Sequence, residues 1–292
     1  MSHTVNVDVT LPSFLRPIHA KRLISIGGSS EPDGTDGNYV IPQDVIDATE
    51  VLVSYGINDD WTFESAMQKA AGATVYAYDQ STKDRFLRRF SRRRLKFNFR
   101  KLRSVVAYAL NTIRGAPQEK REQILKNVKR VYFPSREFHQ FFDGRTAHFY
   151  AEFIGRESDG LTSVTRTLKP HQHHNVMLKM DIEGSEYDVM DELLALPHSV
   201  CAFLAEFHNL DDPHKLEQLQ RFTENTHLKL VHIHANNCAQ LKSDNGTPPV
   251  LELTYVDPKF FEASGESPSY PIGGLDVVNR PSEPDFELRF AS

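Results

Sequence analysis

The feature that most constrains the fold is a strand, turn, helix and second strand between residues 50 and 79. EVLVSYGI (50–57) is an apolar run rich in β-branched residues that meets a glycine, which is typical of a buried strand. Over 58–72 the apolar residues recur at the spacing of one helix face, and a glycine ends the helix. TVYAYD (74–79) is the next strand. This order is the βαβ unit of a parallel sheet.

The same alternation continues toward the C-terminus. Further strands are expected at 147–155, 175–184, 200–208 and 228–237, helices at 185–196 and 214–225, and a short extended piece at 163–168. PVLELTYV (249–256) follows a short Gly/Pro turn and should return antiparallel beside the strand before it. We therefore predict an α/β fold with a Rossmann-like, doubly wound sheet, mostly parallel and ending in a C-terminal antiparallel hairpin.

Composition fits one such domain with additions. Of 292 residues, 39% are hydrophobic, which suffices for a core and excludes a wholly disordered chain. We expect an N-terminal extension at 1–45, a Rossmann-like domain at 46–260 with a basic helical insertion at about 83–132, and a C-terminal coil tail at 261–292. No apolar run approaches the ~18 residues of a membrane span. The first residues lack a signal-peptide pattern, which favours a cytoplasmic protein.

One segment carries a charge opposite to that of the rest of the chain. Residues 83–103 hold eleven lysines and arginines against one aspartate, or +10, which leaves −15 elsewhere because the whole chain has −5. Arginines mixed with Phe86, Phe90, Phe97 and Phe99 suit phosphate contacts and base stacking on a nucleic acid. They equally suit an amphipathic helix on anionic lipid. The third alternative is a solvated helix packed on the acidic body.

Polar residues at the first two strand ends indicate a ligand site, because open α/β sheets bind ligands beyond the carboxyl ends of their strands. Gly56 ends the first strand and Asp79 the second, and an acid at that separation is placed to hold a ribose. The turn between them carries Asn58, Asp59 and Asp60 instead of further glycines. Two carboxylates would repel a pyrophosphate but not a cationic, phosphate-free ligand such as S-adenosylmethionine. The alternative is an ordinary βα turn with a solvated acidic loop.

A second polar group lies at the later strand ends. Asp181 and Glu183 follow one strand, and either is a candidate functional acid or a helix-capping residue. Glu206 and His208 alternate at the end of the next strand, and His232, His234 and Asn236 alternate in the strand after that. Asp181, Glu206 and His234 make a candidate divalent-cation site, and Asp181, His208 and His234 are the candidate catalytic residues.

At these residues the sequence resembles the FkbM-type S-adenosylmethionine-dependent methyltransferases and related methyltransferase-like families. The resemblance runs from Arg22 to Val256, and DIEGSE in its strand–turn–helix setting is its most specific piece. Asn38 departs from the pattern, which usually has glycine there. The matching pieces are RLISIGGSSEPDGTDGNYV, VLVSYGINDDWTFE, VYAYDQS, TSVTRTL, LKMDIEGSE, AEFHN, HIHANN and LELTYV.

The resemblance implies a class I methyltransferase-type fold and S-adenosyl-L-methionine as cofactor. Tyr55, Gly56, Phe63 and Glu64 would line its methionine end, Asp79 would hold its ribose, and Asp181 would lie beside the transferred methyl group. The expected reaction is O-methylation of a sugar or glycan hydroxyl. Its proton would go to His208 or His234, or Asp181 with a divalent cation would acidify the hydroxyl.

Two other functions stay open at this point. The chain is alternatively an RNA-binding or anionic-surface-binding protein, or an RNA methyltransferase, acting through the arginine-rich insertion. It is otherwise a catalytically silent relative that keeps the fold for binding; the joint presence of Gly56, Asp79 and Asp181 argues against that.

Overall fold

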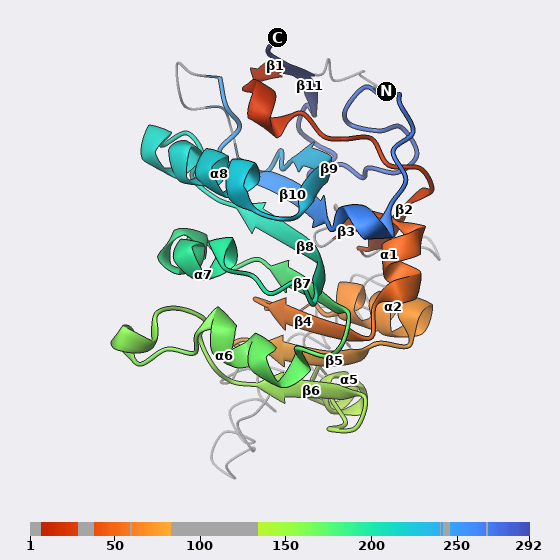
Figure 1. Ribbon diagram of the computed structural model, residues 1–292, viewed down its shortest axis with the longest axis vertical. Helices are drawn as coiled ribbons and strands as arrows, with labels where there is room; N and C mark the ends of the chain where they lie inside the picture. The colour runs from red at the N-terminus through yellow and green to blue at the C-terminus, as the bar shows by residue number, and fades with distance from the viewer. Residues whose placement is uncertain are drawn as a thin grey trace, which may run out of the picture.

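A computed structural model of the chain describes residues 7–28, 38–58, 60–82, 134–239, 241, 246–266 and 268–292. Its centre is a seven-stranded sheet in the order β6-β5-β4-β7-β8-β10-β9 (Figure 1). The strands, in chain order, are β4 (Val51–Tyr55), β5 (Thr74–Tyr78), β6 (Ala147–Tyr150), β7 (Val176–Met180), β8 (Val200–Phe207), β9 (Lys229–Ala235) and β10 (Leu251–Val256).

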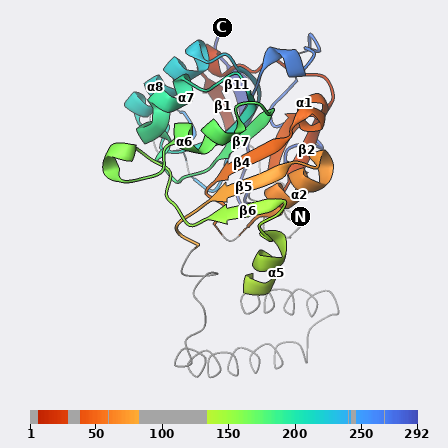
Figure 2. The same cartoon turned by 60° about the horizontal axis from the view of Figure 1, so that its bottom comes forward.

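The chain winds the sheet in two directions from β4. It moves outward through β5 to β6, then returns to the other side of β4 as β7 and continues to β8. Figure 2 shows β6, β5, β4 and β7 side by side in this order. These pairs are all parallel, whereas β10 is antiparallel to both β8 and β9. The predicted doubly wound sheet with a C-terminal antiparallel hairpin is confirmed, and the switch in winding lies at β4 and β7.

Helices cover both faces of the sheet (Figure 1). One face packs against α6 (Val164–Leu168), α7 (Met190–Leu194) and α8 (Pro213–Asn225). The opposite face packs against α1 (Gln43–Ala48), α2 (Thr62–Ala71) and α5 (Pro134–Phe141). Alternate side chains of each strand enter opposite cores, which is why the strands read as continuous apolar runs in the sequence.

The extended piece expected at 163–168 is wrong, because these residues form α6. Ser163 precedes the helix in an extended conformation, and its hydroxyl accepts a hydrogen bond from the Arg166 amide. Val164 and Leu168 are buried in the core on that face. The N-cap and the burial of the apolar side override the strand preference of the β-branched residues. The helix expected at 185–196 is also divided, into a 3-10 segment (Glu186–Val189) and α7.

The two ends of the described chain are strands that pair with each other. β1 (Val7–Leu11) lies parallel to β11 (Phe286–Phe290), and β2 (Leu23–Gly27) forms a hairpin with β3 (Asn38–Pro42). The C-terminal tail was expected as coil, and at β11 this is wrong. The predicted basic helical insertion lies outside the described residues. Within the described part of the chain, no helix is both long and apolar enough to cross a membrane.

Candidate functional site

A cavity of about 560 Å³ opens at the carboxyl ends of β4, β5 and β7, where the winding of the sheet switches direction. Its volume lies in the range of small-molecule sites, ~300–1,000 Å³. Five of its lining residues are acidic and, among the described lining residues, Lys179 is the basic one. The acidic residues are Asp60, Asp79, Glu152, Asp181 and Glu183.

The chain at the end of the neighbouring strand β7 leaves no room for a side chain at position 56, so this residue must be glycine. Its φ is +74°, and its amide donates to the carbonyl of Tyr78 at 3.1 Å. A Cβ on this residue would lie 1.6 Å from the carbonyl oxygen of Asp181. The sequence predicted a close backbone approach to a ligand; Gly56 does line the cavity, but the close approach in the structure is to β7's end. Glycine is thus fixed here by both conformation and space.

Asp79 joins the turn after β4 to the turn after β5. One carboxylate oxygen, Oδ2, accepts from the Asn58 amide at 2.7 Å. The other, Oδ1, accepts from both the amide and the hydroxyl of Ser81 at 2.6 Å. The residue is 7% exposed and lines the cavity. These hydrogen bonds hold the carboxylate in one position on the cavity wall, so it is already oriented to bind a ligand.

Phe63 and Tyr55 were both expected to line the cofactor site, and the structure separates them. Phe63 lines the cavity and packs edge-to-face on Tyr39, with ring centroids 5.4 Å apart. Tyr55 does not line it: the side chain is fully buried in the α6-side core, where its hydroxyl is hydrogen-bonded to Thr167. Burial raises the pKa of Tyr55 far above its ordinary value. The expectation for the Tyr55 side chain is corrected, because its position on β4 directs it to the opposite face of the sheet.

Glu64 lies beneath the cavity wall and not in it. The residue is fully buried, and its Oε1 accepts from the Ser54 hydroxyl at 2.6 Å and lies 3.6 Å from Lys179 Nζ. Lys179 does line the cavity, with Nζ 6.0 Å from the Phe63 ring centroid. Sequence reasoning missed this lysine. The signal was available, since a lysine inside the otherwise apolar run VMLKM of a buried strand requires a partner.

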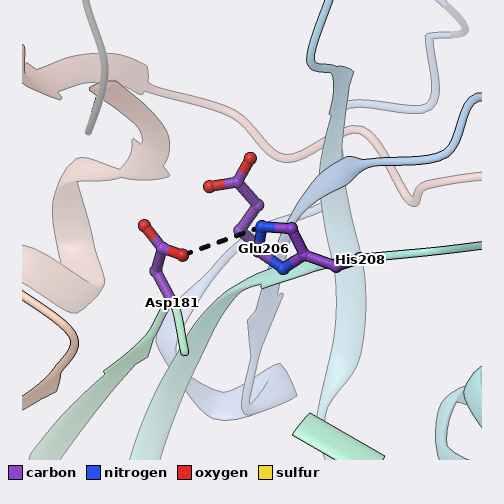
Figure 3. Close-up of side chains that lie close together, drawn as sticks. All are labelled: Asp181, Glu206 and His208. Carbon is purple, nitrogen blue, oxygen red and sulfur yellow. Dashed lines mark ion pairs between the residues drawn. The ribbon is translucent and has the colours of Figure 1, made fainter. Parts of the chain in front are cut away.

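Asp181, Glu206 and His208 come together where β7 and β8 end (Figure 3). One oxygen or nitrogen atom from each lies within 4.8 Å of the others. His208 Nε2 is 4.0 Å from Asp181 Oδ1. Because Asp181 also lines the cavity, this group borders the space that a ligand would occupy.

A buried glutamate fixes the His208 ring. Glu186 is fully buried, and its Oε1 lies 3.0 Å from His208 Nδ1 and accepts from the Gly184 amide at 3.1 Å. Burial alone would lower the pKa of His208, but the hydrogen bond and charge of Glu186, with the charges of Asp181 and Glu183, outweigh burial and raise it. Glu183 itself has a largely exposed side chain, with Oε2 3.6 Å from His208 Nε2.

His234 does not join this group, which corrects its place in the predicted metal site. Its Nδ1 is 3.0 Å from Glu252 Oε2, and its Nε2 is 3.9 Å from Asp285 Oδ1. The reason is the strand order: β10 lies between β8 and β9, and the register sets Glu252 between Glu206 and His234. His208, and not the predicted His234, is the histidine that lies with Asp181 and Glu206.

The basic segment 83–103 and Asp59 lie outside the described residues.

Comparisons with known proteins give distant likenesses only. No family model and no curated protein matches the chain. Similar solved structures include a precorrin-6y C5,15-methyltransferase from Geobacter metallireducens GS-15, with 10% identity over 73% of this chain and 85% of that one. An rRNA methylase from Streptococcus thermophilus has 11% identity over 73% and 90%. Both have a TM-score of 0.34, which is too low to carry a functional argument. The FkbM-type resemblance stays a prediction.

Proposed function

We propose that the protein is an S-adenosylmethionine-dependent methyltransferase that binds its cofactor in the acidic cavity. The observation that carries the proposal is the charge of this cavity at the switch point of the sheet. Five carboxylates line it, and its lysine lies beside the buried Glu64. Such a wall disfavours the phosphates of a nucleotide and favours a positively charged sulfonium.

Three lining residues suit the parts of this ligand. Asp79 presents a fixed carboxylate to which ribose hydroxyls donate. Phe153 lines the cavity and is 55% exposed, so its ring offers a face on which adenine stacks. Asp181 follows β7, on the other side of β4 from Asp79. There it would lie beside the sulfonium and its methyl group.

The proposed reaction is methyl transfer to a hydroxyl, with a sugar or glycan hydroxyl as the acceptor class. The acceptor oxygen attacks the methyl carbon in line with the C–S bond. The C–O bond forms as the C–S bond breaks, and the bonding pair stays on sulfur, giving neutral S-adenosylhomocysteine. The hydroxyl proton must leave as well. Asp181 lines the cavity, and Glu206 and His208 lie in one cluster with it; this cluster is the region where that proton is released.

Calorimetric titration with S-adenosylmethionine and S-adenosylhomocysteine tests the proposal, with ATP as the comparison ligand. Both sulfur nucleosides should bind and ATP should bind far more weakly. Asp79→Asn should weaken binding by about 10- to 100-fold, since hydrogen bonds to a charged group contribute ~1.5–3 kcal/mol. Asp191→Asn is the matched control, because that side chain is 90% exposed and does not line the cavity.

Phe153→Ala adds a variant whose folding should be unaffected, because the side chain is exposed. It should weaken cofactor binding about tenfold, in line with ~1–3 kcal/mol for stacking of a base on an aromatic ring. Absence of binding by both sulfur nucleosides to the folded wild-type protein, or equal binding of ATP, contradicts the proposal.

A further inference from the structure

We infer that Asp181, Glu206 and His208 form a binding site for a first-row divalent cation at the edge of the cavity. The inference deepens the proposed methyl transfer by naming what activates the acceptor hydroxyl, and its catalytic role rests on that proposal. Cation binding itself does not require the cofactor. Two strands supply the site, with Asp181 directly after β7 and the other two residues at the end of β8.

The three side chains are spaced as ligands around a bound ion would be, and not as partners in direct hydrogen bonds. His208 Nε2 and Asp181 Oδ1 are 4.0 Å apart, too far for a hydrogen bond. A cation bound at ~2.1 Å from each of its ligands holds neighbouring ligand atoms ~3–4 Å apart. The three atoms of the cluster lie within 4.8 Å of one another, so an ion between them needs only small side-chain movements.

Hydrogen bonds behind the cluster orient two of the three side chains. Glu186 holds Nδ1 of His208, which leaves Nε2 directed toward Asp181. Glu206 accepts from the Asn236 amide group at 2.7 Å, and the Cys238 amide fixes Asn236 by donating to its Oδ1 at 2.8 Å. A carboxylate behind a histidine is the arrangement that sets the tautomer and orientation of metal-binding imidazoles.

Among the described residues, the charged groups around His208 are carboxylates, which favour binding of a cation. The carboxylates of Asp181, Glu183 and Glu186 all lie within 4.0 Å of one imidazole, and Glu206 lies in the same cluster. Glu186 and Glu206 are buried, so their mutual repulsion is poorly screened by solvent. A protonated His208 would offset one of these charges, whereas a divalent cation offsets two.

The ligand set selects the kind of ion. One imidazole nitrogen with two carboxylate oxygens suits Mn²⁺ or Zn²⁺, while Ca²⁺ takes oxygen ligands. Three protein ligands leave coordination positions of the ion open. Because Asp181 lines the cavity, we expect these open positions to face the cavity. There the ion binds the acceptor hydroxyl through its oxygen and lowers the pKa of that hydroxyl. The proton then passes to solvent as the oxygen takes the methyl group.

Mn²⁺ alone, titrated into the cofactor-free full-length protein and followed by electron paramagnetic resonance of the free ion, tests the site. The wild type should bind one Mn²⁺ per chain with highest affinity. His208→Ala and the isosteric Glu206→Gln should each lower that affinity at least tenfold. Glu186→Gln keeps a hydrogen-bonding group behind the ring and should lower it about 10- to 100-fold, the effect of altering such outer partners.

His173→Ala is the matched control, because this histidine is exposed in the HQHH stretch, which offers a competing surface site. It should leave the high-affinity Mn²⁺ unchanged. Equal affinity in wild type and His208→Ala, or loss of the ion in His173→Ala instead, overturns the inference. Circular dichroism of each variant confirms folding. Mn²⁺ binding without S-adenosylmethionine binding would reject the proposed function alone, and cofactor binding without Mn²⁺ binding would reject the cation site alone.

Discussion

Gly56 ties the geometry of two strand ends together at the level of a single residue. Its left-handed φ makes the turn out of β4, and the missing side chain leaves room for the carbonyl of Asp181. The amide of Asp181 in turn donates to the carbonyl of Tyr55 at 3.1 Å. The position of the candidate catalytic aspartate therefore depends on a glycine in another turn.

Gly56→Ala should be far more destabilising than Gly72→Ala. Both glycines have φ near +70°, so both variants carry the strain of a left-handed residue, ~1–2 kcal/mol. A Cβ at Gly72 meets nothing within 4 Å, whereas at Gly56 it overlaps the Asp181 carbonyl. We expect about 1 kcal/mol for Gly72→Ala and more than about 3 kcal/mol, or no folded protein, for Gly56→Ala. Urea unfolding measures both, and equal losses would contradict the steric argument.

At the level of the element, β7 combines a buried strand with a charged residue. Lys179 is 4% exposed and lies 3.6 Å from the fully buried Glu64 of α2. The pair joins the strand to the helix that covers it, directly below the cavity. Burying two charges is costly, and the cost rises sharply when one partner is removed.

Lys179→Met should lower the free energy of unfolding by about 3–5 kcal/mol, since it leaves the Glu64 carboxylate buried without this cation. The double variant Lys179→Met, Glu64→Leu should recover most of the loss, although the Ser54 hydroxyl then loses its acceptor. Chemical denaturation of the wild type, both single variants and the double variant gives the coupling free energy. Additive losses would show that the two charges do not stabilise each other.

The sequence predicted well those elements whose periodicity was continuous. β4, α2, β5, β7, β8 and α8 follow from apolar runs or a helical repeat. At 163–168 the β-branched residues favoured an extended chain, and only tertiary packing and the Ser163 cap made a helix. For the site, Gly56, Asp79 and Asp181 were placed from strand ends and Phe63 from the family resemblance, and all four line the cavity. The prediction for Tyr55 was wrong because its side chain points to the face of the sheet opposite the cavity. The prediction for His234 was wrong because β10 lies between β8 and β9. Chain order reveals neither feature.

Across the whole molecule, contacts between buried histidines and carboxylates attach the C-terminal tail to β9 and β10 at the edge of the sheet. His232 of β9 lies 3.1 Å from Asp276, and His234 is held between Glu252 of β10 and Asp285 of the tail. Burial would lower the pKa of His234, but the nearby Asp285 carboxylate, the hydrogen bond to Glu252 and the charges of Glu252 and Asp276 raise it well above 6.5. For Asp276, burial acts to raise the pKa, while His232 and His234 lower it below its ordinary value.

These shifts give the fold a pH window. A raised histidine pKa adds stability that is complete below ~6.5 and is lost as pH rises through the folded-state value. A lowered aspartate pKa adds stability that is complete above ~4 and is lost as pH falls through its own folded-state value. Both contributions are complete between these limits.

His234→Gln should reduce stability by about 3 kcal/mol at pH 6, and by progressively less as pH rises through the folded-state pKa of His234, because the wild type then loses this charge. Thermal unfolding of wild type and variant at each pH measures the difference. The exposed His214→Gln on α8 serves as control and should show no such trend. A difference that is the same at every pH would exclude a charged His234.

The insertion of β10 between β8 and β9 also has a consequence for biosynthesis. β9 pairs in the sheet through β10, so a nascent chain that has emerged only as far as residue 250 holds β8 with an open edge and β9 without that neighbour. The ribosome must release six more residues, Leu251–Val256, before this side of the sheet is complete. Until then the unpaired backbone of β8 is open to pairing with strands of other chains. We expect chaperones to bind this incomplete sheet and prevent its aggregation.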